Sequence, residues 1–503
     1  MIVRAGCDQR APHSSALPRW ARELRNFLSF AANIQPSAAV SVDHTLCEIG
    51  ARFAWRHFHG RVTPQLISVL SPQAKRRLKT QIYARLTEVS QPCLQLQMSA
   101  WRSAVDAITA NAQDGRRTAK ADQQLSSRNA DFHLTLLFKQ FPCLARLWCE
   151  LILDWEECTI EILSRFWRDR RTLSRKFFDG RLIDQIVDLR VDASDAHNRG
   201  RTVTVMQFQF GQIVYKPRPG DGEQEWFRFV NWLNGRSFEP RLRAARVLCR
   251  NKYCWMEYIP RKACDNLKSG RRFYERLGGT VAAAYLLGAV DCHRENIVIC
   301  GEHPVLVDAE GLFYPLWPRK RKRDFRTRLL ATGFIARKQD VSASEDQTSM
   351  LNPASSGDHL PRIGTKVLGP AKYEKEILRG FVRVWRCASA TRNGQSSLRA
   401  WIQRRVQPQL RSIHWPSVRY DAIRRKSITP AALRLWSRRR LMITQLCRSA
   451  QKTTSVIELE TAALEKFEIP YFERVATPRR FREAVDPLPD LRRLLRDHIH
   501  QGG

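Results

Sequence analysis

The stretch Asp291-Cys-His-Arg-Glu-Asn-Ile-Val-Ile-Cys-Gly-Glu-His-Pro-Val-Leu-Val-Asp-Ala-Glu310 decides the fold that we predict for this chain. Its two apolar triplets, on either side of Gly301, predict short strands joined by a turn. An apolar run over residues 281–290 precedes them and predicts a helix. Acidic, amide and imidazole groups flank the hairpin, and such groups are costly to gather beside apolar elements unless a cation or a reaction holds them. The stretch therefore predicts a functional hairpin that follows a buried helix.

The order of these polar residues is typical of phosphoryl-transfer enzymes. In protein kinases an Asp accepts the hydroxyl proton, an Asn a few residues later binds Mg²⁺, and an Asp after the next hairpin binds it too. This pattern predicts Asp291 as the base and Asn296, Asp308 and Glu310 as metal ligands. Phosphate oxygens complete the shell of Mg²⁺, so a few protein oxygens suffice. The alternative is a structural hairpin whose acids are solvated or paired with arginine.

Composition limits the class of protein. The chain has 503 residues, 43% of them hydrophobic, which is enough for a buried core and for several domains or one large enzyme. No run approaches the roughly 18 apolar residues that span a membrane, and no secretory signal is recognisable after Met1. The 13 cysteines form no Cys-x-x-Cys pair, which predicts reduced thiols and no zinc or disulfide framework. We therefore expect a soluble, cytoplasmic protein.

The formal net charge of +36 is the most unusual feature of the composition. Nucleic acid is the first partner that such a charge suggests. The arginines are spread along the whole chain, however, and no zinc-finger spacing, basic zipper or RNA-binding signature accompanies them. A basic run at residues 319–323 is a local exception, typical of a solvated loop. An acidic peptide or ATP would also be attracted, so nucleic acid is the less favoured partner.

Three regions are predicted along the chain, in an α+β fold. Residues 1–130 predict helices without a motif, residues 131–315 predict a catalytic core, and residues 316–503 predict a mainly helical C-terminal part. In the core, a strand at 202–210 is followed by a second strand at 213–216. Lys216 ends that strand, where kinase-type folds deliver a cation to nucleotide phosphates. Further elements are predicted as strands at 246–249 and 253–259 and as helices at 132–189, 225–233, 373–385, 397–406, 430–450 and 456–464.

Several ordered motifs resemble the dehydratase domain of class II lanthipeptide synthetases, the LanM-type enzymes. The resemblance runs from about Phe141 to Phe472. That family is similar to lipid kinases in its catalytic core. The resemblance therefore implies a kinase-like core with a helical N-terminal region and helical C-terminal additions. The motifs are Ser194-Asp-Ala-His-Asn-Arg-Gly-Arg201, Val214-Tyr-Lys-Pro-Arg218, Tyr253-Cys-Trp-Met-Glu-Tyr-Ile259, Asp291-Cys-His-Arg-Glu-Asn296, His303-Pro-Val-Leu-Val-Asp-Ala-Glu-Gly-Leu-Phe313 and Glu468-Ile-Pro-Tyr-Phe472.

The resemblance implies two reactions on a ribosomal precursor peptide with an acidic leader. ATP and Mg²⁺ first serve to phosphorylate Ser or Thr, and phosphate is then eliminated to leave a dehydro residue. This order of reactions makes chemical sense because phosphate is a better leaving group than hydroxide, and cations around the phosphate assist its departure. The implied site residues are Lys216 and Arg218 for the phosphates, Asp291 with His293 as the base, Asn296, Asp308 and Glu310 for the metal, Asp195 and His197 for the phosphate side of the pocket, and Arg411 and Ser417 for elimination.

The chain also departs from the family pattern. Ser417 stands where the family has Thr, and Trp415 stands where a second Arg is expected. No counterpart of the family's zinc-dependent cyclase follows residue 473, so we expect no zinc and no ring formation by this chain. A separate cyclase is then an expected partner. Two alternatives stay open: a catalytically inactive relative that only binds an acidic leader peptide, and a basic protein that binds nucleic acid.

Overall fold

The computed structural model describes residues 17–34, 42–110, 130–236, 238–315, 325–335, 350–351, 359–392, 395–405, 407–449, 452–476 and 491. Its helices and strands confirm the predicted α+β class. Contacts group the chain into two compact units, residues 1–213 with 414–471 and residues 214–413 with 472–503. The three regions predicted from the sequence stay a prediction, and the basic run at 319–323 lies outside the described residues.

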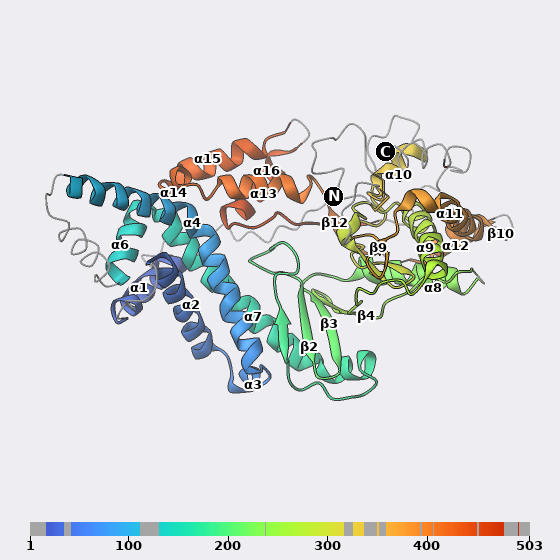
Figure 1. The fold of residues 1–503 in the computed structure, drawn as a ribbon, viewed down its shortest axis with the longest axis horizontal. Helices are drawn as coiled ribbons and strands as arrows, with labels where there is room; N and C mark the ends of the chain where they lie inside the picture. Colours follow the sequence, from blue (N-terminus) through green and yellow to red (C-terminus); the bar gives the residue numbers. More distant parts are fainter. Residues whose placement is uncertain are drawn as a thin grey trace. The chain divides into compact units, whose positions relative to one another are not determined.

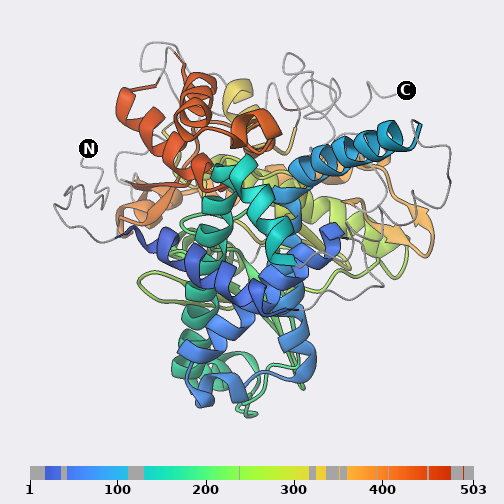
Figure 2. The ribbon, with the colours of Figure 1, turned by 90° about the vertical axis from the view of Figure 1, so that its left-hand side faces the viewer.

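Helices dominate the first unit, which confirms the helical character predicted for the N-terminal region. In α7, Pro142 occupies the first turn and two basic residues lie in the last turn, both favourable positions. Trp148 of α7 donates its indole N–H to Ser90 of α4 at 2.7 Å, and Figures 1 and 2 show these two long helices side by side. The helices are α1 (Arg19–Ala32), α2 (Val42–Arg61), α3 (Pro64–Ser68), α4 (Pro72–Ala110), α6 (Ala130–Gln140) and α7 (Pro142–Phe177).

A short antiparallel pair and four further helices complete the first unit. In that pair, β1 (Asp188–Arg190) lies beside β2 (Thr204–Phe208). The single helix predicted at 430–450 is wrong, because Leu435 is extended and the chain changes direction before Trp436. Arg439 is fully buried and donates to the carbonyl oxygens of Ser427 at 2.9 Å and Glu465 at 2.7 Å. The helices are α13 (Ser417–Lys426), α14 (Pro430–Leu433), α15 (Trp436–Cys447) and α16 (Thr454–Glu465).

The second unit contains three neighbouring strands and the helix that follows the first of them. The strand order is β3 (Gly211–Lys216), β5 (Cys254–Glu257), β4 (Val247–Cys249), and β3 crosses the boundary between the units. These strands confirm the predictions at 213–216, 246–249 and 253–259. Helix α8 (Asp221–Asn234) confirms the helix predicted at 225–233 but begins earlier, with two acids in its first turn, where they favour a helix start.

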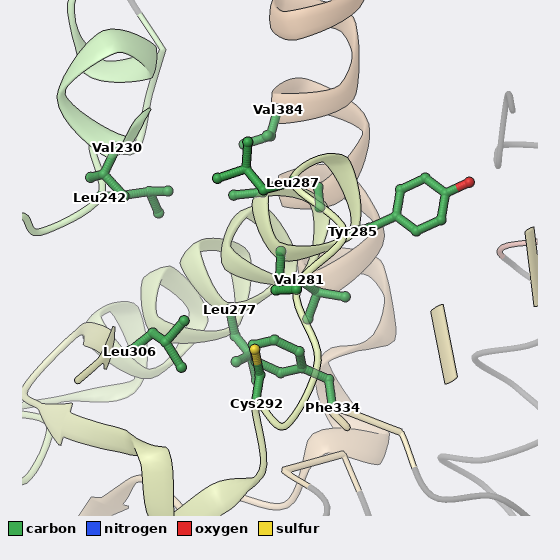
Figure 3. Close-up of a cluster of buried hydrophobic side chains, with 14 of the residues drawn as sticks. Val230, Leu242, Leu277, Val281, Tyr285, Leu287, Cys292, Leu306, Phe334 and Val384 are labelled. Carbon is green, nitrogen blue, oxygen red and sulfur yellow. The ribbon is translucent and has the colours of Figure 1, made fainter. Parts of the chain in front are cut away.

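The buried helix predicted ahead of Asp291 is α9 (Leu267–Leu286). Asn266 and Ser269 form a capping box at its start, with the Ser269 N–H donating to Asn266 Oδ1 at 2.9 Å. Figure 3 shows Leu277 and Val281 of α9 in one buried cluster with Cys292, Leu306 and Phe334. The hydrophobic core therefore includes the segment that follows α9, through Cys292.

The remaining elements of the second unit are short, apart from one helix that packs on α9. Helix α11 (Glu374–Ser389) has a buried face along Ile377, Phe381 and Val384. Across the described residues, no helix combines the length and the apolar character needed to cross a membrane. The short elements are η1 (Arg294–Asn296), β6 (Ile297–Cys300), β7 (His303–Leu306), α10 (Phe325–Ala331), β8 (Arg362–Ile363), β9 (Lys366–Val367), η4 (Pro370–Tyr373), β10 (Thr391–Arg392), β11 (Gln395–Ser396), α12 (Ser397–Gln403), β12 (Gln409–Ser412) and β13 (Phe472–Val475).

Candidate active site

The predicted hairpin is present as the antiparallel pair of β6 and β7. Ile297 lies opposite Leu306, and Cys300 lies opposite His303. The apolar residues of both strands are buried except Val298, which is partly buried, and the polar residues of the motif lie at the open end of the hairpin. There the Val307 N–H donates to the Asn296 carbonyl oxygen at 2.8 Å. The end of the ladder thus places Asn296 next to the backbone that carries Asp308.

The segment after the hairpin is fastened to the end of α9, just before Asp291. The Val290 N–H donates to Gly311 O at 3.1 Å, and the Phe313 N–H donates to Leu287 O at 2.9 Å. A Cβ at residue 311 would lie 2.5 Å from Val290 O, so only glycine permits this approach. Asp291 has a φ of 65°, a left-handed conformation that is uncommon outside glycine and recurs at functional sites. These contacts bring the two acidic motifs together.

Asp291 lies among groups suited to a general base. His293 Nε2 is 3.6 Å from Asp291 Oδ1, and the Asn296 side-chain amide donates to Asp291 O at 2.8 Å. Burial raises the pKa of Asp291, while His293 and Arg411 act in the opposite direction. The side chain keeps 40% of its surface exposed, so it can be reached from solvent. A carboxylate with a raised pKa is a better proton acceptor than an ordinary Asp.

Lys216 is the buried cation of the site. Its Nζ donates to Glu223 Oε1 at 2.7 Å and to Val307 O at 2.7 Å, and it lies 3.9 Å from Asp308 Oδ2. Burial lowers the pKa of Lys216, but the carboxylates of Asp308 and Glu223 outweigh this effect and the net direction is upward. Because Val307 also bonds to Asn296, the lysine, the amide residue and Asp308 converge on one backbone position.

Two arginines balance the acids around Lys216. Arg218 contacts Asp308 at 2.7 Å and Glu310 at 3.0 Å, and it makes two bonds to Glu223 at 2.8 and 3.2 Å. Arg411 contacts Glu310 at 2.6 Å. Burial opposes ionisation of Glu310, yet Arg218 and Arg411 hold its pKa below the usual value. We call this group the ion network; it consists of Lys216, Arg218, Arg411, Glu223, Asp308 and Glu310.

Glu223 is a site residue that the sequence reasoning missed. Its side chain is fully buried, and its partners Arg218 and Lys216 outweigh the burial effect and lower its pKa. A Cβ at residue 222 would lie 2.3 Å from Ala309 O, so glycine lets the start of α8 approach this segment. The sequence signal was a Glu in the first turn of a helix that follows a strand-end lysine. A Lys–Glu ion pair is also a feature of kinase-type folds.

The oxygen atoms of Asn296, Asp308 and Glu310 have the chemistry that Mg²⁺ prefers. In the described part of the chain, no three His, Cys, Asp or Glu side chains form a ready-made metal site. A divalent cation held by these residues would have to take its other ligands from phosphate and water. For that, Arg218 would have to release Asp308, which it now contacts at 2.7 Å.

Asp195 and His197 belong to the first unit, on a loop held by the segment at 468–471. His197 Nδ1 lies 2.7 Å from Ile469 O, and the Ile469 N–H donates to Ala196 O at 2.9 Å. The Arg199 N–H donates to Glu468 Oε2 at 2.9 Å. The motif around Asp195 and the motif that begins at Glu468 are far apart in the sequence but are hydrogen-bonded to each other in the structure. The Asp195 side chain at its edge is exposed.

Ser417 is also in the first unit, as the first residue of α13 after Pro416. Trp415, which replaces an expected arginine, carries two cations on its ring: Arg419 at 3.5 Å and Lys452 at 2.8 Å from the centroid. The structure therefore brings together the predicted residues of the second unit, which are Lys216, Arg218, Asp291, His293, Asn296, Asp308, Glu310 and Arg411. Asp195, His197 and Ser417 lie in the other unit.

Comparison with known proteins places the chain in a family. A family model described as a domain of unknown function, DUF4135, matches residues 141–352 and 337–474. The chain belongs to the DUF4135 family. A similar protein, the lacticin 481/lactococcin biosynthesis protein LcnDR2 of Lactococcus lactis subsp. lactis, is 26% identical over 141 residues. That match covers 26% of this chain and 15% of the relative. The ion network and the Asp195 loop both fall within the DUF4135 range.

Proposed function

We propose that this DUF4135 protein dehydrates Ser or Thr residues of a ribosomal precursor peptide, using ATP, in a kinase-like core. The observation that carries the proposal is the convergence of Lys216, Asn296 and Asp308 around Val307. The likeness to a protein named for lacticin 481 biosynthesis supports a peptide substrate. The net charge of +36 suits a precursor with an acidic leader. Such an ATP-dependent reaction is expected in the cytoplasm.

In the first step, the peptide hydroxyl oxygen attacks the γ-phosphorus of ATP and the bond to the ADP oxygen breaks. Asp291 accepts the hydroxyl proton, and His293 holds the carboxylate in place. Lys216 and Arg218 neutralise the phosphates. Mg²⁺, bound through Asn296, Asp308 and Glu310, would supply further positive charge to the phosphoryl group.

In the second step, a base removes the proton from Cα of the phosphorylated residue. The electron pair forms the Cα–Cβ double bond, and the Cβ–O bond breaks to release phosphate. Arg411 and Lys216 stabilise the leaving charge. The roles in elimination that the resemblance implies for Ser417, Asp195 and His197, which belong to the first unit, stay predictions. A separate cyclase would close the rings, because this chain is proposed to act without zinc and without cyclisation.

ATP binding is the first test. Mg-ATP should raise the unfolding temperature of the wild-type protein and leave that of Lys216→Met unchanged, because the variant lacks the buried ammonium group. Arg404→Gln is the control, since Arg404 is exposed and lies outside the ion network. If Mg-ATP leaves the wild-type temperature unchanged, the proposal is wrong.

Peptide modification is the second test. The protein is incubated with Mg-ATP and synthetic Ser- and Thr-containing peptides that begin with an acidic segment, and the products are weighed. Loss of water supports the complete reaction, and a stable added phosphate shows a kinase without elimination. Tight peptide binding without any mass change would favour the inactive, leader-binding alternative. Binding of RNA in preference to peptide would favour the nucleic-acid alternative.

A further inference from the structure

The two-stranded ribbon that carries Arg411 has a second arginine with a distinct role. β12 and β13 are antiparallel, with Leu410 opposite Arg474 and Arg411 opposite Glu473. Because successive residues of a strand face opposite sides, Arg474 lies on the face opposite to the Arg411 side chain. Arg411 uses its own face to reach Glu310.

Arg474 binds main-chain oxygens of two separate segments. Its Nε donates to Arg411 O at 3.0 Å, its Nη1 donates to Phe313 O at 3.2 Å, and its Nη2 donates to Leu312 O. The guanidinium also lies 5.0 Å from the centre of the Tyr314 ring. One side chain thus joins the backbone of Arg411 to the segment that carries Asp308 and Glu310.

These bonds are specific to a guanidinium group. No ion pair within the described residues includes Arg474, and burial lowers its pKa to about 10, so it remains charged at neutral pH. Its donors radiate in one plane and can meet three widely spaced carbonyl oxygens at once, a geometry that the compact ammonium of a lysine can reproduce only in part. One of these oxygens belongs to Phe313, whose φ of 48° is unfavourable for a bulky residue and is retained only when surrounding contacts fix it.

The ribbon has only a few other polar attachments to this segment. The Arg411 N–H donates to Glu310 O at 3.0 Å, and Tyr314 Oη donates to Ile413 O at 2.6 Å. Without Arg474, the strand that presents Arg411 would keep its side-chain contact to Glu310 but lose three backbone bonds. The Arg411 guanidinium would then be held only by the bonds of Arg411 to Glu310 and by the β12–β13 pairing, so its position would be less strictly fixed.

We propose that Arg474 is a positioning residue for phosphate elimination. It sets the backbone of Arg411 against the Asp308–Phe313 segment, so that the Arg411 guanidinium meets the departing phosphate in a fixed geometry. This inference rests on the proposed function. It assigns Arg474 no contact with peptide or nucleotide.

The test separates elimination from phosphorylation. Elimination is followed as inorganic phosphate released from a synthetic phosphoserine peptide with an acidic N-terminal segment, in the presence of Mg-ADP. Phosphorylation is followed with Mg-ATP and the unphosphorylated peptide. Arg474→Gln should slow elimination by about 10- to 100-fold, the range for a catalytic group misplaced by an ångström. Phosphorylation should stay within about twofold, and Arg474→Lys should recover part of the elimination rate.

The controls distinguish a positioning role from a structural one. Arg404→Gln, an exposed arginine of the same unit, should leave both rates unchanged. If Arg474→Gln lowers both rates in equal proportion, or neither, Arg474 is not a positioning residue for elimination. Should Arg474→Gln fail to fold, the same ratio in Arg474→Lys decides. Absence of both activities in the wild-type protein would instead overturn the proposed function, and this role with it.

Discussion

The pKa values of buried carboxylates shift in opposite directions in two regions of the molecule. These regions are the ion network of the second unit and the cluster around Glu468 in the first unit. In the ion network, three cations face three carboxylates, and the pKa values of Glu223 and Glu310 are lowered despite burial. In the Glu468 cluster, which we define as Asp154, Arg199 and Glu468, the Arg199 guanidinium pairs with Asp154 at 3.1 Å and also with Glu157 at 2.6 Å, and Glu468 receives from Arg199 only the backbone N–H. Burial raises the pKa of Asp154, and it raises that of Glu468 to about 7.

The difference shows what each region is suited for. The ion-paired side chains of the ion network do not lose their charge. They can, however, be rearranged around an anionic ligand, such as ATP in the proposed site. An acid near its titration point can lose its charge without breaking its bonds to backbone N–H groups. The Glu468 cluster therefore holds the Asp195 loop through hydrogen bonds and makes its stability depend on pH near neutrality.

The largest expected effect is a loss of activity caused by a substitution in the second unit. Asp291→Asn should lower peptide phosphorylation by at least about 100-fold, because the amide cannot accept the hydroxyl proton. The rate is measured from the mass of the product peptide at fixed Mg-ATP. Asp265→Asn changes an exposed aspartate of the same unit and should leave the rate unchanged. An unchanged rate in Asp291→Asn would remove this residue from the mechanism.

The second prediction compares the regions by stability. Glu223→Gln leaves Lys216 and Arg218 without their fully buried partner, so it should lower the free energy of unfolding at neutral pH by about 3–5 kcal/mol. Denaturant titration measures this loss. Glu239→Gln breaks an ion pair that is about 70% exposed on both sides and should change stability by less than about 1 kcal/mol. Equal losses in the two variants would show that the ion network contributes no more than a surface pair.

The fold around the site could be predicted from the sequence because its elements have strong local patterns. The apolar run ahead of Asp291 and the two apolar triplets on either side of Gly301 correspond to α9 and the β6–β7 hairpin. The boundaries were harder, as the break at Leu435 shows. There, no glycine or proline marks the end of α14, and the extended conformation arises in a stretch of good helix formers.

The site was harder to predict than the fold, because charge alone does not distinguish one residue from another in an arginine-rich chain. Arg474 is one of 85 basic residues, and its role follows only from the three carbonyl oxygens that surround it. Glu223 lies in a stretch with the turn-forming pair Asp221-Gly222, so its place in α8 was missed. Long-range partners such as Glu468 and Arg199 leave no local pattern at all.

The third prediction concerns pH. The raised pKa of Glu468 means that the folded protein binds more protons than the unfolded chain between pH 4.5 and about 7. Its contribution to stability is therefore present at low pH and is lost as pH rises through this window. The full shift corresponds to roughly 3 kcal/mol. Glu468→Gln should remove this decline, because the amide oxygen still accepts the Arg199 N–H and carries no charge.

The measurement is the difference in unfolding free energy between wild type and Glu468→Gln at several pH values. Glu223→Gln provides the contrast. Because the pKa of Glu223 is lowered in the folded protein, its stabilising contribution is present above the pKa that it has in the unfolded chain and is lost on acidification. The Glu468 difference should thus fall as pH rises from 4.5 to about 7, whereas the Glu223 difference should stay level there and fall only on acidification below 4.5. Parallel curves would contradict the distinction between the two regions.

The smallest expected change in stability comes from Asp195→Asn, and this variant tests whether Asp195 takes part in the proposed reaction. Asp195 is exposed on the loop that Glu468 and Ile469 hold, so the substitution should change the unfolding free energy by less than about 0.5 kcal/mol. If Asp195 belongs to the phosphate side of the proposed site, peptide modification should nevertheless fall clearly. Asp192→Asn, at an exposed aspartate that pairs with Arg85, is the control for the same loop region and should leave modification unchanged. Equal activity of Asp195→Asn and wild type would remove Asp195 from the mechanism, because its carboxylate would then contribute no chemistry.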